Sequence, residues 1–376
     1  MKNIREVKDL RGKRVLLRLD LNIPIKGGVV FNDFRIKKIL PTINFLKEEG
    51  AKIIIISHIG RETTETLLPV LNYFQKTMEI GFIKDVLSND ADSFVNNMKE
   101  GDVVLVENLR QSDGEKNNDE SFSKQIARLG DIYVNEAFAN SHREHASIVG
   151  VPKFLPSYSG ILFQEEIKML SESFQPENPF LFIIGGNKLK TKLSLIEKML
   201  KIADNVFVGG ALANDFFKEK GMNVGKSFIS EEKINLSSLV DNKKIILPTD
   251  VVVRNDGGCI KMKKPNEVLN DEKILDAGDE TVSHLIKYVN DAKFVLLNGP
   301  LGDYEKGFGK PTADLIRAIA NSDAKSIVGG GDTTAVISEL GIENKFTFVS
   351  TGGGAMLAFL LNETLPGIDA LDKDYK

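Results

Sequence analysis

The sequence has few cysteines and histidines and no tryptophan, and the first two shortages exclude several classes of protein. One cysteine, Cys259, among 376 residues excludes an internal disulfide and a cysteine-based zinc cluster, which is typical of a reducing compartment. The four histidines form no His-Glu-x-x-His arrangement, so we expect no zinc site. No Gly-x-Ser-x-Gly occurs, and no Gly-x-Gly-x-x-Gly follows a strand, which disfavours a serine hydrolase and a nicotinamide dehydrogenase.

Charge of one sign and long apolar runs are also lacking. The net charge is −4, so no global basic field indicates a nucleic-acid partner. No apolar run approaches the roughly 20 residues of a membrane span, and the first residues lack the apolar stretch of a signal peptide. We therefore expect a cytoplasmic protein that binds neither nucleic acid nor membrane, with enough hydrophobic residues (42%) for two domains.

Short apolar runs alternate with helical periodicity along the whole chain. Strands are predicted at 14–19, 53–56, 103–106, 132–134, 180–184, 205–208, 244–247, 294–297, 326–328 and 346–349. Helices are predicted at 33–49, 67–78, 120–128, 190–201, 211–219, 281–290, 312–320, 333–340 and 355–361. Such alternation predicts an α/β protein with parallel sheets covered by helices on both faces. The amphipathic helix at 161–170 and the Pro-containing segment up to Pro179 favour a connector at 161–179 between domains 1–160 and 180–361.

Arginines follow the predicted strands of the first half. In open parallel sheets, ligands bind beyond the carboxyl ends of the strands. Arginine is suited to bidentate recognition of phosphate or carboxylate. One loop arginine is usually a surface charge, but four at equivalent positions predict a site for a small polyanion. We call this predicted site the arginine rim. The residues that would form it are Asp20, Asn22, Arg35, His58, Arg61, Arg110 and Arg143.

The stretch 180–192 predicts a second anion site. A buried strand at 180–184 ends in Gly185-Gly186, and Lys188, Lys190 and Lys192 crowd the start of the next helix. Cations are unfavourable at a helix N-terminus, and Lys188 and Lys192 repel at a spacing of four. The alternative is an ordinary solvated face, but glycines, free N–H groups and lysines together favour a bound anion.

Glycine turns follow further strands of the second half. These are Asn298-Gly299-Pro300, with Glu305 nearby, Gly329-Gly330-Gly331-Asp332-Thr333 and Ser350-Thr351-Gly352-Gly353-Gly354. Backbone without side chains at helix starts can close on phosphates, and Asp332 can carry magnesium. The sequence 221–227 is no Walker A motif, because three residues separate its glycines and a helix precedes it. Gly221 is instead predicted to end that helix.

Taken together and in order, these motifs resemble the phosphoglycerate kinase family over essentially the whole chain. The carrying motifs are Arg18–Pro24, Asp33–Ile36, Ser57–Arg61, Glu107–Arg110, Asn135–Phe138, Ser141–Ser147, Gly185–Lys188 with Lys192, Asn298–Pro300, Gly329–Thr333 and Ser350–Gly354. The resemblance implies two doubly wound, Rossmann-like domains joined by a hinge helix, with the C-terminal tail (about 362–376) packing back on the first domain. It implies a monomer that transfers a phosphoryl group between 1,3-bisphosphoglycerate and ADP, giving 3-phosphoglycerate and ATP.

The resemblance also implies a role for each site residue. The rim would bind the glycerate substrate, and Arg35, Lys188, Gly330 and Gly331 would act in catalysis. Mg²⁺ with ATP or ADP would bind at Lys192, Asn298, Glu305, Gly330, Gly331, Asp332 and Thr333, with Asp332 at the metal. Arg35 and Lys188 are expected to meet the migrating phosphoryl group when the domains close.

The chain departs from the family pattern in four places. Leu297 replaces an aromatic residue, Ala139 a glycine, and Asp303-Tyr304 a more apolar pair, while the loop 62–68 is short. Two other functions stay open from the sequence alone. They are a kinase for another small phosphorylated carboxylate and a catalytically silent nucleotide-binding protein of the same fold.

Overall fold

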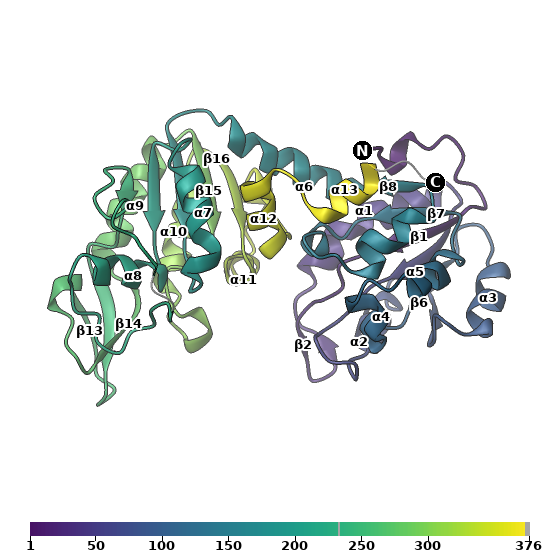
Figure 1. Cartoon of the computed structure of the whole chain (residues 1–376), viewed down its shortest axis with the longest axis horizontal. Coiled ribbons are helices and arrows are strands. Elements are labelled where there is room, and N and C mark those ends of the chain that lie inside the picture. Colours follow the sequence, from purple (N-terminus) through teal and green to yellow (C-terminus); the bar gives the residue numbers. More distant parts are fainter. Residues whose placement is uncertain (232–233, 373–376) are drawn as a thin grey trace. The chain divides into compact units, whose positions relative to one another are not determined.

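The computed structural model describes residues 1–231 and 234–372, which divide into two compact units (Figure 1). Unit 1 contains residues 1–168 and the C-terminal segment that begins at residue 362, and unit 2 contains residues 169–361. The division falls within helix α6 (Ile161–Ser171), inside the segment predicted as a connector. Residues 373–376 of the predicted tail lie outside the described residues.

Unit 1 is built on a six-stranded parallel sheet. Its strands in spatial order are β5 (Gly81–Ile83), β6 (Val103–Val106), β4 (Lys52–Ile56), β1 (Arg14–Arg18), β7 (Ile132–Asn135) and β8 (Ser157–Ser159). The register aligns Arg18 with Ile56 on one side and with Asn135 on the other, so these three strands end at one edge. Ile53–Ile56 are fully buried, as expected for a parallel strand covered on both faces.

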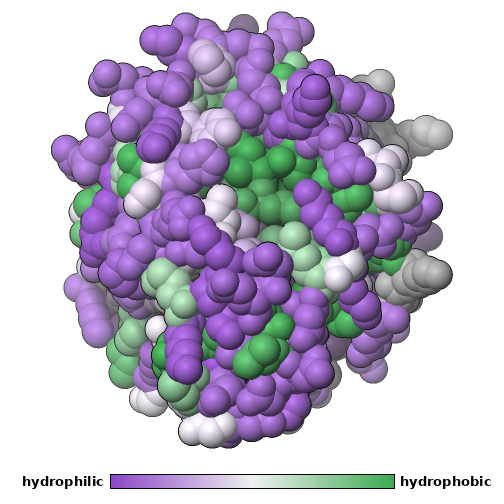
Figure 2. Space-filling model, turned by 90° about the vertical axis from the view of Figure 1, so that its left-hand side faces the viewer, coloured by the Kyte–Doolittle hydropathy of each residue, from purple (hydrophilic) through white to green (hydrophobic). Residues whose placement is uncertain are grey.

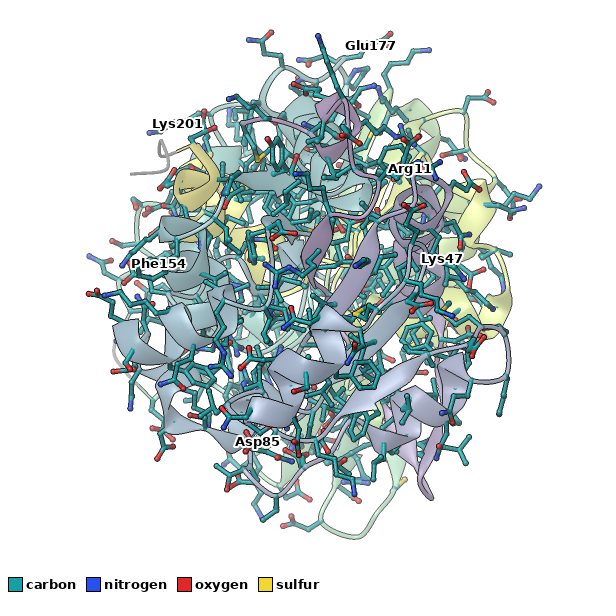
Figure 3. All side chains as sticks on the ribbon, turned by 90° about the vertical axis from the view of Figure 1, so that its right-hand side faces the viewer. Arg11, Lys47, Asp85, Phe154, Glu177 and Lys201 are labelled. Carbon is teal, nitrogen blue, oxygen red and sulfur yellow. The ribbon has the colours of Figure 1, made fainter. Side chains whose placement is uncertain are left out.

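The helices of unit 1 cover this sheet and carry polar side chains outward. They are α1 (Phe34–Glu48), α2 (Leu68–Phe74), α3 (Asn89–Asn96), α4 (Asp113–Lys116), α5 (Glu120–Ala127) and α13 (Pro366–Asp372). A hairpin, β2 (Ile25–Lys26) with β3 (Val29–Val30), follows β1. The Gly367 N–H donates to Ser141 O at 2.9 Å, which ties α13 to unit 1. Exposed charged residues such as Arg11 and Asp85 lie at the periphery (Figure 3).

Unit 2 has a second six-stranded parallel sheet. In spatial order its strands are β11 (Ile245–Ile246), β10 (Asn205–Val208), β9 (Phe180–Ile184), β15 (Phe294–Asn298), β16 (Lys325–Gly329) and β17 (Phe348–Val349). Its helices are α7 (Leu189–Met199), α8 (Leu212–Glu219), α9 (Asp279–Asp291), α10 (Lys310–Ala320), α11 (Gly331–Leu340) and α12 (Gly354–Asn362). The two parallel sheets confirm the predicted fold class. Gly221 follows α8 with φ +76°, which confirms its predicted place at the helix end.

Unit 2 also contains an antiparallel sheet that the periodicity analysis missed. Its strands are β13 (Ile260–Lys263), β12 (Val251–Asn255) and β14 (Glu272–Ala277). The signal was present, because Asp256-Gly257-Gly258 separates two runs of strand-forming residues, and Gly258 adopts φ +82°. Figure 2 shows apolar patches on this side of unit 2, whose exposed apolar residues include Ile260 and Met262.

The helices were also searched for membrane-spanning segments. Within residues 1–231 and 234–372, none is long and apolar enough to cross a membrane.

Candidate functional site

In each unit, the candidate site lies at the carboxyl edge of the parallel sheet. When the parallel strands of unit 1 are numbered along the chain, their spatial order is 3-4-2-1-5-6, and the order changes direction between β1 and β7. In unit 2 the order is 3-2-1-4-5-6, and the change falls between β9 and β15. Crevices beyond such points are the usual ligand sites of open α/β sheets. The predicted rim residues and glycine turns follow these strands.

Arg35, Asp20 and Asn22 form one cluster beyond β1. Arg35, in the first turn of α1, donates from Nη1 to Asp20 Oδ2 at 2.8 Å and to the Asn22 carbonyl at 3.1 Å. Asn22 Oδ1 accepts from the Gly60 N–H at 2.9 Å, which links the loops after β1 and β4. Asp20 is buried, whereas about 29% of the Arg35 side chain is exposed, so the guanidinium can still reach a ligand.

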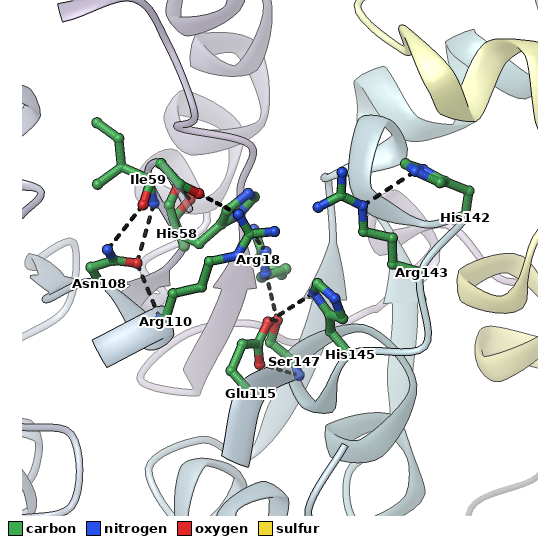
Figure 4. A network of polar contacts seen from close by, with 12 residues as sticks. Arg18, His58, Ile59, Asn108, Arg110, Glu115, His142, Arg143, His145 and Ser147 are labelled. Atoms are coloured by element: carbon green, nitrogen blue, oxygen red, sulfur yellow. Dashed lines mark hydrogen bonds and ion pairs between the residues drawn. The ribbon is translucent and has the colours of Figure 1, made fainter. Parts of the chain in front are cut away.

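Arg110 and Asn108 join the loops after β4 and β6. Asn108 Oδ1 accepts from Ile59 N at 3.2 Å and from Arg110 N at 3.1 Å, and Arg110 Nη1 donates to the Gly60 carbonyl (Figure 4). Burial and the neighbouring guanidinium of Arg143 lower the pKa of Arg110. Arg61, by contrast, is exposed, and its backbone N–H donates to Glu65 Oε2 at 2.5 Å.

The loop after β7 brings Arg143 and two histidines to the same edge. Arg143 is exposed, and its Nε lies 3.3 Å from His142 Nε2 (Figure 4). Burial, followed by the arginine charges, lowers the pKa of His145 to about 4, and burial and Arg143 lower that of His142. The histidines are therefore neutral at physiological pH, and arginines supply the positive charge of the rim.

Three residues of unit 1 that the motif analysis assigned no role connect these loops. Arg18, at the end of β1, is fully buried and donates from Nε to Ser147 Oγ at 2.8 Å. Ser147 in turn contacts the buried carboxylate of Glu115. An arginine inside a buried strand was the available signal, because a buried guanidinium needs partners.

Several polar atoms on this edge are buried and have no hydrogen-bond partner among the described residues. They include His58 Nε2, Arg110 Nε and His142 Nδ1. Burying an unsatisfied donor or acceptor costs about 1–3 kcal/mol, so such atoms are rare in native proteins. Their concentration at the arginine rim indicates a place where a ligand supplies the missing partners.

The glycine turns of unit 2 pack against one another beyond β9 and β15. A Cβ on Gly185 would lie 2.0 Å from the Pro300 carbonyl oxygen, and one on Gly210 would lie 2.6 Å from Gly186 N. Gly330 adopts φ +103°, and its Cβ position lies 3.1 Å from Gly299 N. The turns that were separate in the sequence therefore form one surface of closely spaced backbone, open to an anion.

Lys188 and Lys192 flank this surface differently. Lys188 is exposed and is the residue preceding α7, where its side chain makes no capping hydrogen bond. Lys192 donates from Nζ to the Gly185 carbonyl. Burial lowers the pKa of Lys192 to about 8, against the opposing effect of Asp332, and Lys188 lowers it further. Within the described part of the chain neither lysine forms an ion pair, and two such cations at a helix start favour an anionic ligand.

Asp332, Thr333 and Asn298 complete this edge. Burial and the nearby carboxylate of Glu305 raise the pKa of Asp332. Thr333 is fully buried at the start of α11, and its Oγ1 has no partner among the described residues. Asn298 is buried at the end of β15, where its Nδ2 lies 3.4 Å from Met356 Sδ.

A pocket of about 310 Å³ opens beside the glycine turns. Its lining includes the apolar side chains of Phe217, Phe228 and Leu275 and the carboxylates of Asp332 and Glu305. Of the predicted nucleotide-site residues, Glu305 and Asp332 line it, and the others lie on the adjacent turns and on the helices that begin there. Leu275 belongs to the antiparallel sheet and was missed with it, whereas Phe217 lies in α8 and Phe228 lies outside the named strands and helices.

Magnesium fits this edge as an ion carried by a phosphate ligand. No group of three or more His, Cys, Asp or Glu side chains within residues 1–231 and 234–372 could hold a metal by itself. Burial first, and then the carboxylate of Glu305, raise the pKa of Asp332, so a cation at this position would favour its charged form. Mg²⁺ is usually held by one or two carboxylates together with substrate phosphates, and this donor set suits that arrangement.

Comparisons with known proteins agree with this geometry. The phosphoglycerate kinase family model matches residues 4–363. The phosphoglycerate kinase of Enterococcus faecalis is 39% identical over 99% of this chain and 99% of its own. That of Borrelia garinii subsp. bavariensis is 38% identical over 99% of this chain and all of its own. The phosphoglycerate kinase structure from Pyrococcus horikoshii superposes with a TM-score of 0.88 at 30% identity, covering 99% and 98% of the two chains.

The matching family model and the full-length relatives define the chain as a phosphotransferase. The acceptor in this class of enzyme is a carboxyl group. The chain belongs to the phosphoglycerate kinase family, which confirms the resemblance drawn from its motifs.

Proposed function

We propose that the arginine rim of unit 1 binds the phosphorylated carboxylate and that the glycine surface of unit 2 binds the nucleotide. The activity is that of the family, phosphoglycerate kinase. It transfers a phosphoryl group reversibly between 1,3-bisphosphoglycerate and ADP, giving 3-phosphoglycerate and ATP in glycolysis. The unpaired buried polar atoms beside the arginines carry this proposal, because the oxygens of an anionic ligand would supply the acceptors that the donors lack and balance the arginine charges.

For the acceptor, Arg61, Arg110 and Arg143 supply charge to the phosphate and the carboxylate. Asp20 and Asn22 hold the substrate hydroxyl, and His58 donates a hydrogen bond. At about 4 Å, one unit charge contributes roughly 4 kcal/mol at an effective dielectric near 20. This supports a small, highly charged substrate over a neutral sugar.

For the nucleotide, the backbone at Gly330 and Gly331 approaches the phosphates, and Lys192 and Thr333 contact them. Asn298 and Glu305 belong to the same site. Asp332 would hold Mg²⁺, which when bound neutralises phosphate charge during transfer. The apolar side chains that line the pocket suit the base of ATP or ADP.

Catalysis then depends on alignment and charge stabilisation, with little covalent help from the protein. Arg35 and Lys188 act on the phosphoryl group in transit. They belong to different units, so we infer that the connector at 161–179 serves as a hinge for domain closure, which also excludes water. A cytoplasmic location follows from a role in glycolysis, and the monomer remains a prediction that sedimentation equilibrium would test.

A coupled assay with Mg-ATP and 3-phosphoglycerate tests the function, with other small phosphorylated carboxylates as competing substrates. We expect turnover with 3-phosphoglycerate and a far lower kcat/KM with the others. Preference for another carboxylate would favour the alternative kinase, and tight nucleotide binding without turnover would indicate a catalytically silent protein of this fold.

A further inference from the structure

Arg18 is a buried cation whose immediate partners are all uncharged. Its Nε donates to Ser147 Oγ at 2.8 Å, its Nη1 donates to the Leu19 carbonyl, and its Nη2 lies 3.0 Å from His58 Nδ1 (Figure 4). The side chain is fully buried, and its Nε, Nη1 and Nη2 already have partners, so these nitrogens do not need a ligand. A charge in this position needs a balancing group close by.

Glu115 supplies that negative charge through Ser147. Its Oε1 accepts the Ser147 hydroxyl at 2.6 Å, its Oε2 accepts the Ser147 N–H at 2.9 Å, and Oε1 lies 3.8 Å from His145 Nδ1. The single hydroxyl proton of Ser147 is therefore directed at Glu115. Ser147 Oγ is left as an acceptor, which is what Arg18 Nε requires.

The directions of the hydrogen bonds also fix the tautomer of the His58 imidazole. A guanidinium has only donors, so His58 Nδ1 must accept from Arg18 and the ring proton must lie on Nε2. Burial and the charges of Arg18, Arg110 and Arg143 hold the pKa of His58 far below its ordinary value, so the ring is neutral. Its Nε2 is buried and has no partner among the described residues.

We propose that Glu115 is a positioning residue for the acceptor site. Through Ser147 and Arg18, it holds His58 as the neutral tautomer whose Nε2–H donates to an oxygen of the phosphorylated carboxylate. The assignment rests on the proposed function for the identity of that ligand. Glu115 itself contacts Ser147 and lies beside His145, and it does not touch the substrate.

The chain of contacts Glu115–Ser147–Arg18–His58 is called the relay below. Substitution of Glu115 by glutamine, its neutral isostere, would break this relay. In Glu115→Gln the amide NH₂ competes for Ser147 Oγ, so that oxygen can no longer accept fully from Arg18. The Arg18 guanidinium also loses its balancing charge. The Arg18–His58 contact weakens, and the Nδ1–H tautomer of His58 becomes populated.

Nitrogen NMR of the histidine rings at neutral pH tests this directly. The chain has four histidines, and His58→Gln identifies the signals of His58. In the wild type we expect an unprotonated Nδ1, a protonated Nε2, and a shift of Nε2 when 3-phosphoglycerate is added. Glu115→Gln should move the two nitrogen shifts toward each other. Glu120→Gln, on the exposed surface of α5, is the matched control and should leave them unchanged.

The kinetic counterpart is a selective rise in KM. Glu115→Gln should raise KM for 3-phosphoglycerate roughly tenfold, the effect of a lost hydrogen bond to a charged ligand, while KM for ATP stays within about twofold. Ser147→Ala interrupts the same relay and should act in the same direction, which provides a second variant if Glu115→Gln does not fold.

Three outcomes would overturn the inference. They are a wild-type ring protonated at Nδ1, an unchanged His58 tautomer in both variants, or a tautomer change without an effect on KM for 3-phosphoglycerate. If 3-phosphoglycerate neither binds nor turns over, the proposed function fails instead. The wild-type spectrum without ligand still tests the relay in that case.

Discussion

In unit 1 the carboxyl edge of the sheet carries arginine and histidine side chains, whereas in unit 2 the equivalent edge is built from glycine turns. The first edge carries Arg35, Arg61, Arg110 and Arg143, which come from the segments that follow four different strands. At the second edge, backbone segments pack directly against one another, as at Gly185 and Pro300. A small acceptor with two anionic groups is fixed by planar guanidinium groups, while a polyphosphate chain can lie along backbone N–H groups.

The two edges also differ in their balance of charge. In unit 1, burial, followed by the charges of neighbouring arginines, lowers the pKa of His58 and of Arg110, and the arginines leave the site with an excess of positive charge. In unit 2, burial and Glu305 raise the pKa of Asp332, while Lys192 opposes that shift. The first edge suits a bare polyanion, and the second suits an anion that arrives with a cation.

The largest effect is expected when Lys188 is replaced, because it is the residue of unit 2 proposed to contact the phosphoryl group in transit. Lys188→Ala should lower kcat by about 10²–10³-fold, the loss typical of a group that stabilises transition-state charge. KM for both substrates should change little, because the interaction forms in the transition state. Lys190→Ala on the same helix start is the control and should retain kcat. A normal kcat with a raised KM would contradict the assignment.

Arg35→Ala tests the same step from unit 1. It should reduce kcat to a similar degree, although the Asp20 carboxylate also loses its partner at 2.8 Å. Steady-state kinetics at saturating concentrations of both substrates measures this. A change confined to KM for 3-phosphoglycerate would make Arg35 a binding residue only.

Substitution of Gly330 tests whether the glycine backbone of unit 2 is needed for ADP binding. Gly330→Ala forces an L-residue to φ +103°, and should cost about 1–3 kcal/mol of unfolding free energy and weaken ADP binding. Gly331→Ala adds a Cβ that meets nothing within 4 Å, so its stability should match the wild type. Denaturant titration and calorimetry with ADP separate the two variants. Equal stability of both would show that backbone strain does not matter there.

A buried carboxylate at the end of β7 makes the stability of unit 1 sensitive to pH. Glu136 accepts from Leu162 N at 3.0 Å and from Phe163 N at 2.9 Å, at the start of α6, and burial raises its pKa from 4.5 to about 7. The folded state then holds a proton that the unfolded chain has released, so unfolding free energy falls as pH rises from 4.5 to 7. The fall should be of the order of 1–3 kcal/mol.

Glu136→Gln cannot titrate and should remove this slope, as measured by denaturant titration at several pH values. Glu120→Gln, at an exposed position, should keep the wild-type slope. A slope that survives in Glu136→Gln would assign the pH dependence to another group.

The smallest effect concerns Lys192, the half-buried lysine side chain on the glycine surface. Its pKa of about 8 should rise when phosphates bind, because their negative charge favours the protonated amine. Near pH 9, ADP binding should therefore be accompanied by the uptake of as much as about one proton. The affinity for ADP should fall as the pH rises further. Calorimetry in buffers of different ionisation heat counts this proton. Lys192→Arg keeps the charge and should abolish the uptake. Unchanged uptake in that variant would exclude Lys192 as its source.

Periodicity and turn chemistry predicted both parallel sheets, and most of the predicted site residues lie at the carboxyl edges of those sheets in the structure. The arginines of unit 1 were recognisable because strands and loops alternate regularly there. Arg18 and Glu115 were missed because their role depends on the contact that each makes with Ser147, 129 and 32 positions away in the chain. Leu275 was missed because the antiparallel sheet interrupts the alternation of strands and helices, and Phe228 lies between the predicted elements. Tertiary contacts of this kind leave no local periodic signal.

The division of labour between the two edges is tested most directly by titrating one variant, Arg110→Ala, with 3-phosphoglycerate and with Mg-ADP by calorimetry. The account predicts that affinity for 3-phosphoglycerate falls at least about tenfold, the loss of a charged hydrogen-bonding partner, while affinity for Mg-ADP is unchanged. Weakened Mg-ADP binding with intact binding of 3-phosphoglycerate would contradict the assignment of the two sites.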